Sequence, residues 1–235
     1  MYHSINFGEK NTWSDWHLVP SSRPVFNPPS LKERYLDIPG GDGAIDLTEA
    51  LTGYPVFNNR TGSLEFIVMN DYWPWTEAYS TICDYLHGRK MRAVLEDDSE
   101  YYYEGRFKVN RWKSDKAYSL ITIDYTVAPY KKRLSPTVIN MVAGTDNNFS
   151  KYTITSDQYG IAPQCPKINV RTPQGVEMTL KFKNETLGIL TTKTLSAGEQ
   201  YFPDLVLYGD SVSCSVKVSV STPYSLELTC EYGRL

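Results

Sequence analysis

Three histidines and four cysteines are the residues of this sequence best suited to catalysis or metal binding. The histidines are His3, His17 and His87, so residues 88–235 lack the commonest general base and metal ligand. Cys83 and His87 lie one helical turn apart, a spacing that could bring a thiol and an imidazole together as nucleophile and base. We favour a simpler interpretation, in which Cys83 belongs to the core and His87 lies at a helix end, near the C-terminal dipole.

The remaining chemistry-bearing patterns are weak. The cysteines, at positions 83, 165, 214 and 230, show no Cys-x-x-Cys spacing and have no neighbouring pair of histidines, so they do not indicate a zinc site. Cys214 and Cys230 fall on strand-like segments and could face each other, but we expect free thiols in a reducing compartment. The sequence has no GxSxG, HExxH or GxxxxGK[ST] motif. We therefore predict no catalytic residues, no metal site and no cofactor.

Two loops carry carboxylates near glycines or near one another. Gly40–Asp46 approaches the calcium-binding GGxGxD pattern but has an extra residue before its second carboxylate. We interpret it as a glycine turn that leads into a short capped helix over residues 47–51. Glu96–Glu100 holds four carboxylates, which repel one another unless a rigid loop spaces them. We interpret this run as the solvated tip of a hairpin.

Composition narrows the class of protein. The 235 residues carry a formal charge of −3, which argues against a dedicated binder of duplex nucleic acid. Aromatic residues make up 13 % of the chain, and they favour sheets and protein interfaces. No apolar stretch approaches the roughly 20 residues of a membrane-spanning helix, so no membrane insertion is expected. Residues 1–6 do not read as a secretory signal, which leads us to expect folding in a cytoplasm.

The elements expected in the N-terminal half are one helix and a set of antiparallel strands. Apolar residues at 79, 82, 83 and 86 form one stripe and predict a helix over 76–87 that Gly88 ends. The first forty residues are rich in proline and predict an extended arm with short edge strands. Strands are expected over the ranges 64–69, 91–96, 101–112 and 117–127, the last three as a meander with long hairpin arms.

The C-terminal half alternates apolar and polar residues in short runs, as in Cys214–Val220 and Leu226–Tyr232. About eight such strands in roughly 100 residues predict a β-sandwich. Residues 128–136 contain two prolines and a basic triplet, and they break the alternation on both sides as a linker does. We predict two domains, 1–133 and 134–235.

The aromatic residues nearest the ends of these elements are candidates for subunit contacts. Trp13 and Trp16 lie near the terminus, where they either dock on a neighbouring subunit or pack into their own domain. For Tyr101, Tyr102 and Tyr103 we favour packing within the sheet, and we retain them beside the tryptophans as candidate subunit-interface residues.

Residues 1–133 carry a set of short motifs that together resemble the distal tail proteins of siphophages and prophages of Gram-positive bacteria. Each motif alone is weak, but they occur together and in the same order. They are Ile5–Gly8, Asn11–Leu18, Ile38–Thr48, Asn59–Arg60, Leu86–Gly88, Tyr103–Arg106 and Pro129–Lys131. Residues 134–235 resemble that family only in length and strand pattern.

The resemblance implies a mainly β fold, with an N-terminal β-sandwich that has one α-helix and a long β-hairpin, followed by a C-terminal galectin-like β-sandwich. It implies no enzymatic activity. The family's hub is a homohexameric ring, single or stacked in two, at the distal end of a long non-contractile tail. There it joins the tail tube protein to the tail-tip or baseplate proteins and, in some relatives, to receptor-binding proteins. The expected location is the virion, after assembly in the cytoplasm of the bacterial host.

Net charge adds an expectation about DNA. Six copies at −3 each sum to about −18, which favours passage of DNA through a lumen without specific binding.

Two other functions remain open. A carbohydrate-binding module for adhesion to host cells is the main alternative, because galectin-like sandwiches can hold sugars against an exposed aromatic ring. All five tryptophans lie before residue 113, however, so the second domain lacks the usual stacking platform. An enzyme would need a cleft with convergent polar groups.

Overall fold

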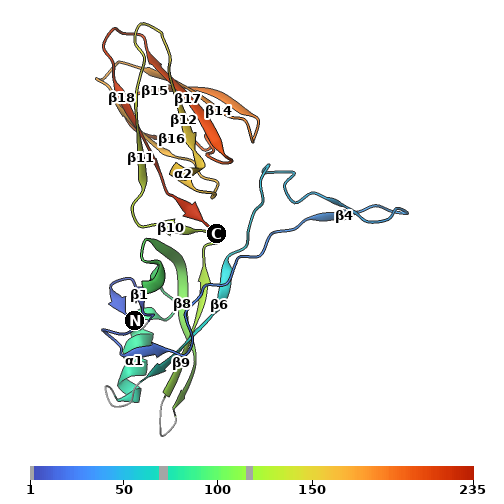
Figure 1. Ribbon diagram of the computed structural model, residues 1–235, viewed down its shortest axis with the longest axis vertical. Helices are drawn as coiled ribbons and strands as arrows, with labels where there is room; N and C mark the ends of the chain where they lie inside the picture. The colour runs from blue at the N-terminus through green and yellow to red at the C-terminus, as the bar shows by residue number, and fades with distance from the viewer. Residues whose placement is uncertain (1–2, 69–73, 115–118) are drawn as a thin grey trace. The chain divides into compact units, whose positions relative to one another are not determined.

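The computed structural model describes residues 3–68, 74–114 and 119–235. The chain is mainly β and divides into two compact units (Figure 1). Unit 1 comprises residues 1–131 with Leu235, and unit 2 comprises residues 132–234. No helix in the described part of the chain is long and apolar enough to cross a membrane.

Unit 1 is built on one antiparallel sheet with the strand order β2-β1-β7-β8-β9-β6-β3. Its strands are β1 (Ile5–Phe7), β2 (Lys10–Asn11), β3 (Leu18–Pro20), β6 (Arg60–Val68), β7 (Lys90–Leu95), β8 (Tyr101–Ser114) and β9 (Ser119–Val127). β8 and β9 form a long hairpin whose register shifts between Val109 and Arg111. The predicted meander is confirmed. Met69, Ala117 and Tyr118, at the ends of predicted strands, lie outside the described residues.

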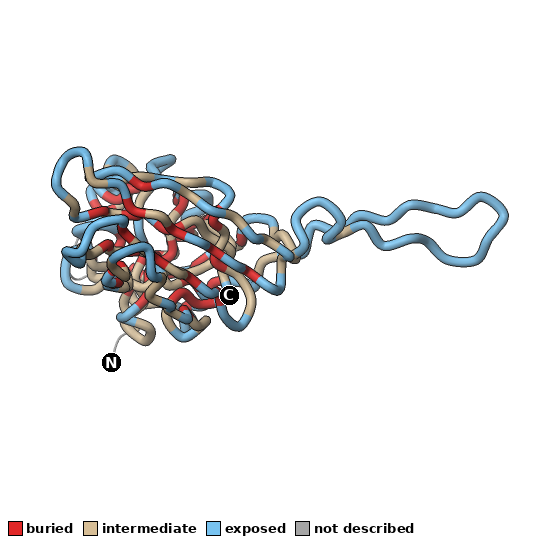
Figure 2. The backbone as a smooth tube through the Cα atoms, turned by 90° about the horizontal axis from the view of Figure 1, so that it is seen from above, coloured by how far each residue is buried: buried red, intermediate tan, exposed pale blue. Residues whose placement is uncertain are grey.

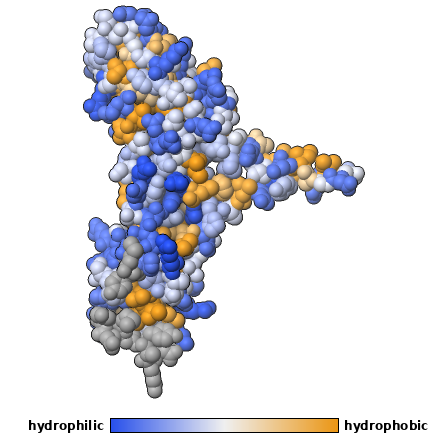
Figure 3. All heavy atoms as spheres, viewed as in Figure 1, coloured by the Kyte–Doolittle hydropathy of each residue, from blue (hydrophilic) through white to orange (hydrophobic). Residues whose placement is uncertain are grey.

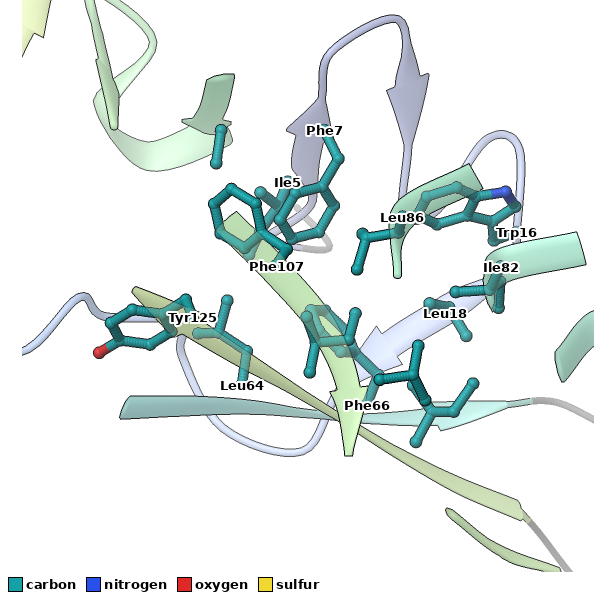
Figure 4. Close-up of a cluster of buried hydrophobic side chains, with 14 of the residues drawn as sticks. Ile5, Phe7, Trp16, Leu18, Leu64, Phe66, Ile82, Leu86, Phe107 and Tyr125 are labelled. Carbon is teal, nitrogen blue, oxygen red and sulfur yellow. The ribbon is translucent and has the colours of Figure 1, made fainter. Parts of the chain in front are cut away.

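One helix packs on this sheet. α1 (Trp75–Leu86) matches the predicted helix within one residue at each end, and Ala78, Ile82 and Leu86 are buried. Strands from both ends of the sheet contribute to the same core, which Figure 4 shows around Phe66. The sheet therefore curls over its own apolar face, with α1 closing the remaining side. The core includes Ile5, Phe7, Trp16, Leu18, Leu64, Phe66, Ile82, Leu86, Phe107, Ile121, Ile123 and Tyr125.

A separate two-stranded hairpin interrupts unit 1 between β3 and β6. β4 (Tyr35–Asp37) pairs with β5 (Ala44–Asp46), and Gly40 and Gly43 adopt positive φ at the tip. The helix predicted over residues 47–51 is wrong, because these residues form turns. Asp46 accepts a hydrogen bond from the Thr48 backbone N–H at 2.9 Å, which stabilises a turn. So short an exposed segment also has no core to pack against.

Unit 2 is a β-sandwich of two four-stranded antiparallel sheets. One sheet has the order β11-β18-β13-β16 and the other β12-β17-β14-β15. Between them lies a second core that includes Met141, Ile154, Phe182, Cys214 and Leu228. The strands are β11 (Thr137–Val142), β12 (Ser150–Thr155), β13 (Lys167–Arg171), β14 (Met178–Asn184), β15 (Ile189–Leu195), β16 (Gly198–Tyr201), β17 (Ser211–Val218) and β18 (Ser225–Cys230).

Short elements complete unit 2. The one-turn helix α2 (Ser156–Tyr159) follows β12 and is capped reciprocally by Thr155 and Gln158. β10 (Lys131–Arg133) pairs with β19 (Gly233–Arg234). The alternation of apolar and polar residues thus produced the expected sandwich, since each strand buries one face and exposes the other.

Candidate assembly surfaces

The two tryptophans near the N-terminus lie in different environments. Trp16 is 2 % exposed and lies in the core of unit 1 with Phe7 (Figure 4). Its ring also meets that of Tyr85 edge-on. Trp13 is half-buried and meets the ring of His17 edge-on, with 5.8 Å between ring centroids. Of the two, only Trp13 therefore has much surface left to offer a neighbouring subunit.

The motif that holds these tryptophans is a hydrogen-bonded loop between β2 and β3. The Asn11 side-chain oxygen accepts hydrogen bonds from the backbone N–H groups of Trp13 and Ser14. The Asp15 carboxylate in turn accepts from the Asn11 backbone N–H at 2.9 Å and from Lys10. These hydrogen bonds, the one from Asn11 foremost, lower the pKa of Asp15. The spacing of polar residues in this motif therefore serves the loop itself.

The three consecutive tyrosines of β8 are all buried, at 7 %, 4 % and 7 % exposure for Tyr101, Tyr102 and Tyr103. Each ring lies beneath a cation, which for Tyr102 is the Arg92 guanidinium at 4.2 Å from the ring centroid. The cations over Tyr101 and Tyr103 are those of Lys131 and Arg60. Contacts of this kind fix the rings within the chain. Trp16 and the three tyrosines thus have little surface left for another subunit.

Arg60 is a buried cation in unit 1. It is 4 % exposed, and its guanidinium donates to the backbone carbonyls of Pro129 at 2.8 Å and Asn27 at 3.1 Å. Burial lowers its pKa. Arg60 thereby ties the chain before β4 and the chain after β9 to the start of β6. Packing thus explains Arg60 of the Asn59–Arg60 motif, whereas Asn59 is exposed.

The acidic run Glu96–Glu100 was predicted to be a solvated tip, but only Ser99 and Glu100 are exposed, and Glu96–Asp98 is half-buried. The Asp97 carboxylate contacts His3 Nδ1 and accepts from Arg23 Nε, each at 2.8 Å, and its side chain is 14 % exposed. Glu96 accepts from the Ser4 backbone N–H at 2.8 Å. Distant parts of the chain supply these partners, which local sequence could not reveal. The turn therefore anchors the N-terminal segment.

The most exposed apolar surface of unit 1 belongs to the hairpin between β3 and β6. We define the arm as residues Ser30–Asn58. Its base is joined by backbone hydrogen bonds of 2.8 Å, from Asn58 to Ser30 and from Lys32 to Val56. Between Ser30 and Gly53 every residue is exposed except the half-buried Thr48, as Figure 2 shows in pale blue. The exposed apolar residues are Leu31, Tyr35, Leu36, Ile38, Ile45, Leu47 and Leu51.

The reactive residues do not converge on a reaction centre in the described chain. Burial raises the pKa of Cys214 to about 12 and that of Cys230 to about 11, so both thiols stay protonated in the core. All four cysteines are free. Among residues 3–68, 74–114 and 119–235, no three His, Cys, Asp or Glu side chains gather closely enough to hold a metal ion.

A hollow of about 540 Å³ lies in unit 2, lined by Gln164, Cys165, Lys167, Tyr201 and Thr229 among others. The Gln164 amide donates to the backbone carbonyls of Tyr159 and Glu231, and its oxygen accepts from the Glu231 N–H. This side chain is thus committed to the fold. Tyr201, which is 60 % exposed, is the aromatic ring that the hollow offers.

Comparison with known proteins identifies the fold. No family model matches the sequence, and no curated protein matches it significantly. Among solved structures it matches SPP1 Dit, presented as a paradigm of the hub adsorption apparatus in phages that infect Gram-positive bacteria. The match has a TM-score of 0.65 and 14 % identity, and it covers 97 % of this chain and 98 % of that one. The chain has the fold of SPP1 Dit. The Dit-like, mainly β fold implied by the N-terminal motifs is therefore confirmed.

Proposed function

We propose that this chain is a structural component of a phage tail hub, in which six copies form a ring at the distal end of a long non-contractile tail. The observation that carries the proposal is the arm, in a chain with the fold of SPP1 Dit. In this role the ring joins the tail tube protein to the tail-tip proteins and to receptor-binding proteins. Its location is the virion, after assembly in the host cytoplasm, and its role is non-enzymatic.

The arm has the character of a segment made to bind another subunit. A two-stranded hairpin without a core is at best marginally stable in water. Leu36 and Ile45 are paired across the two strands and are 55 % and 47 % exposed. Figure 3 shows the hydrophobic residues that gather along the arm. Burial against a neighbour would remove this apolar surface from water and order the hairpin.

Arm exchange is also compatible with a closed ring. If the arm of each copy lies on the next copy, the contact joins two different surfaces, and such heterologous contacts form a ring when their rotation closes. Trp13, half-buried beside His17, is our remaining candidate for this contact among the aromatic residues chosen from the sequence. The other four candidates are buried inside unit 1, where their packing supports the subunit surface. They are Trp16, Tyr101, Tyr102 and Tyr103.

Native mass spectrometry of the purified chain tests this proposal. We expect a hexamer or a pair of stacked hexamers. The double variant Leu36→Ser with Ile45→Ser removes exposed apolar side chains that belong to neither core. We therefore expect it to fold but to remain a monomer. The matched control is Val138→Ser with Val142→Ser, two unit 2 residues that are 49 % exposed each, which should still assemble. A wild-type chain that stays monomeric when mixed with its tail-tip partners contradicts the proposal, as does a ring that the arm variant leaves intact.

A carbohydrate-binding module is the second candidate, and the observation that favours it is the hollow beside Tyr201. An exposed tyrosine ring with Lys167 and Thr229 nearby has the composition of a sugar site. A glycan array probed with the full chain tests this function. Specific binding that Tyr201→Ala abolishes supports it, and a blank array rejects it.

A further inference from the structure

The outer face of one sheet of unit 2 carries positive charge and no negative charge. On β12, β17, β14 and β15 the side chains that alternate with buried residues point away from the core. These thirteen positions hold four lysines, eight serines or threonines, and Leu190. They are Lys151, Thr153, Thr155, Thr179, Lys181, Lys183, Leu190, Thr192, Thr194, Ser211, Ser213, Ser215 and Lys217. We call this surface the lysine face.

The register of the strands spaces the four lysines regularly. Lys151 and Lys181 both lie opposite Ser215, on its two sides, so their backbones are about 10 Å apart. Lys183 follows Lys181 on the same side of β14, about 7 Å along the strand. Lys217 lies opposite Thr179, which precedes Lys181 by two residues on β14. Along the strand direction, Lys217 and Lys183 therefore lie on opposite sides of Lys181. Lys181 is thus the centre of an array of positive charges on a rigid sheet.

Internal contacts neutralise little of this charge. Lys183 pairs with Glu185, but in the described part of the chain no carboxylate lies within ion-pair distance of the other three lysines. Lys181 and Lys217 both approach the ring of Phe149, with Nζ at 4.3 Å and 5.2 Å from its centroid. Each ammonium group is attracted to the face of the ring, but the two positive charges repel each other. A bound anion would relieve that repulsion.

The opposite sheet provides an internal comparison. Its outer face carries both signs of charge, with Lys167, Arg171, Glu199 and Glu227. Arg171 and Glu227 form an ion pair at 2.6 Å. Residues 132–234 as a whole hold ten basic and nine acidic residues. The one-sided charge therefore reflects the placement of residues on the lysine face and not the composition of the unit.

We propose that the lysine face binds a linear polyol phosphate polymer of a bacterial cell surface. Ammonium groups bind phosphates as point charges, and the face has none of the arginines that bind phosphate or carboxylate in bidentate fashion. Serine and threonine hydroxyls can hydrogen-bond both phosphate oxygens and polyol hydroxyls. The occupant is thus a hydrophilic chain that carries a phosphate in each repeat.

The side chains disfavour the other polyanions. The centres of protein interfaces are depleted in lysine and serine and enriched in aromatic residues, which is the reverse of this face. Single-stranded nucleic acids are held by stacking on aromatic rings. Phe149 is the ring nearest to the lysines, and two ammonium groups already contact it.

The inference rests on the proposed hub function, which would place several copies of the face at the cell surface together. A single face with four lysines would bind weakly, and a ring would bind one polymer through several copies with higher avidity. The face belongs to unit 2, so binding itself does not depend on the arm.

The experiment measures binding of fluorescently labelled poly(glycerol phosphate) to the full chain by anisotropy at 50 mM salt. The competing probes are poly-glutamate, an oligothymidine and neutral dextran. We expect poly(glycerol phosphate) to bind most tightly, with an affinity that falls about tenfold or more between 50 and 200 mM salt. Lys151→Gln with Lys181→Gln should weaken binding at least tenfold and make the salt dependence shallower.

Matched variants separate a site from nonspecific charge. Lys90→Gln with Lys108→Gln removes two exposed lysines of unit 1 and should change the affinity less than twofold. Lys151→Arg with Lys181→Arg keeps the charge and should retain binding. Equal losses of affinity in the two glutamine variants overturn the proposal. Tighter binding of poly-glutamate than of poly(glycerol phosphate) also overturns it and indicates an acidic protein as the occupant. Tighter binding of oligothymidine overturns it and indicates nucleic acid. Absence of binding by a hexameric preparation overturns this inference alone, whereas polymer binding by an obligate monomer overturns the hub proposal alone.

Discussion

At the scale of the residue, close packing of the backbone explains two glycines of unit 1, one of which, Gly105, belongs to the Tyr103–Arg106 motif. Gly105 of β8 faces β9, where an added Cβ would lie 2.2 Å from the Thr126 carbonyl oxygen. Gly62 of β6 lies opposite Tyr125, whose hydroxyl would be 2.4 Å from an added Cβ and which accepts from the Asn27 N–H. The sequence shows such glycines, but it does not show which strand approaches them.

We predict that Gly105→Ala destabilises unit 1 by about 1–3 kcal/mol, because backbone atoms of β9 must move to admit the methyl group. Urea denaturation followed by tryptophan fluorescence measures this, since all five tryptophans lie before residue 113. Gly41→Ala is the control, because its added methyl would meet a side chain of the exposed arm. A midpoint for Gly105→Ala equal to that of the control would contradict the packing argument.

At the scale of the element, predictions from the sequence were best where one face of an element is buried. The helix α1 shows its 3.6-residue period because Ala78, Ile82 and Leu86 enter the core. The strands of unit 2 show a period of two for the same reason. β4 and β5 have no buried face, so the alternation that identifies strands is absent, and only the glycines and prolines marked the arm as extended.

The turn at Glu96–Asp98 carries a prediction about pH. Burial alone would raise the pKa of Asp97, but hydrogen bonds from His3 and Arg23 outweigh it and hold that pKa below its ordinary value. The folded chain therefore gains stability from this carboxylate above about pH 4, and loses it as the pH falls through the lowered value. Asp97→Asn should unfold at lower urea than wild type at pH 7, and the difference should shrink below about pH 4.

Urea midpoints at several pH values measure the effect. Asp42→Asn, which removes an exposed carboxylate at the tip of the arm, provides the control. A gap between wild type and Asp97→Asn that stays constant down to pH 3 would show that Asp97 acts through packing and not through its charge.

At the scale of the whole molecule, the candidate surfaces could be predicted less well than the fold. Aromatic residues attract attention in a sequence because they are frequent at interfaces, yet Trp16 and Tyr101–Tyr103 are buried within the chain. The arm was visible only as an irregular segment, and the lysine face depends on the pairing of four strands. Both surfaces arise from long-range arrangement, which a local pattern does not contain.

Net charge and its distribution together set the expected behaviour toward DNA. A ring of six copies carries about −18, so the long-range field repels a phosphate backbone. The lysine face is a local exception of four cations per copy, which the net negative charge of the ring outweighs at long range. We therefore predict that the assembled ring does not retain duplex DNA even at 20 mM salt, measured by co-sedimentation. Retention that Lys151→Gln with Lys181→Gln abolishes would instead show that the lysine face serves nucleic acid.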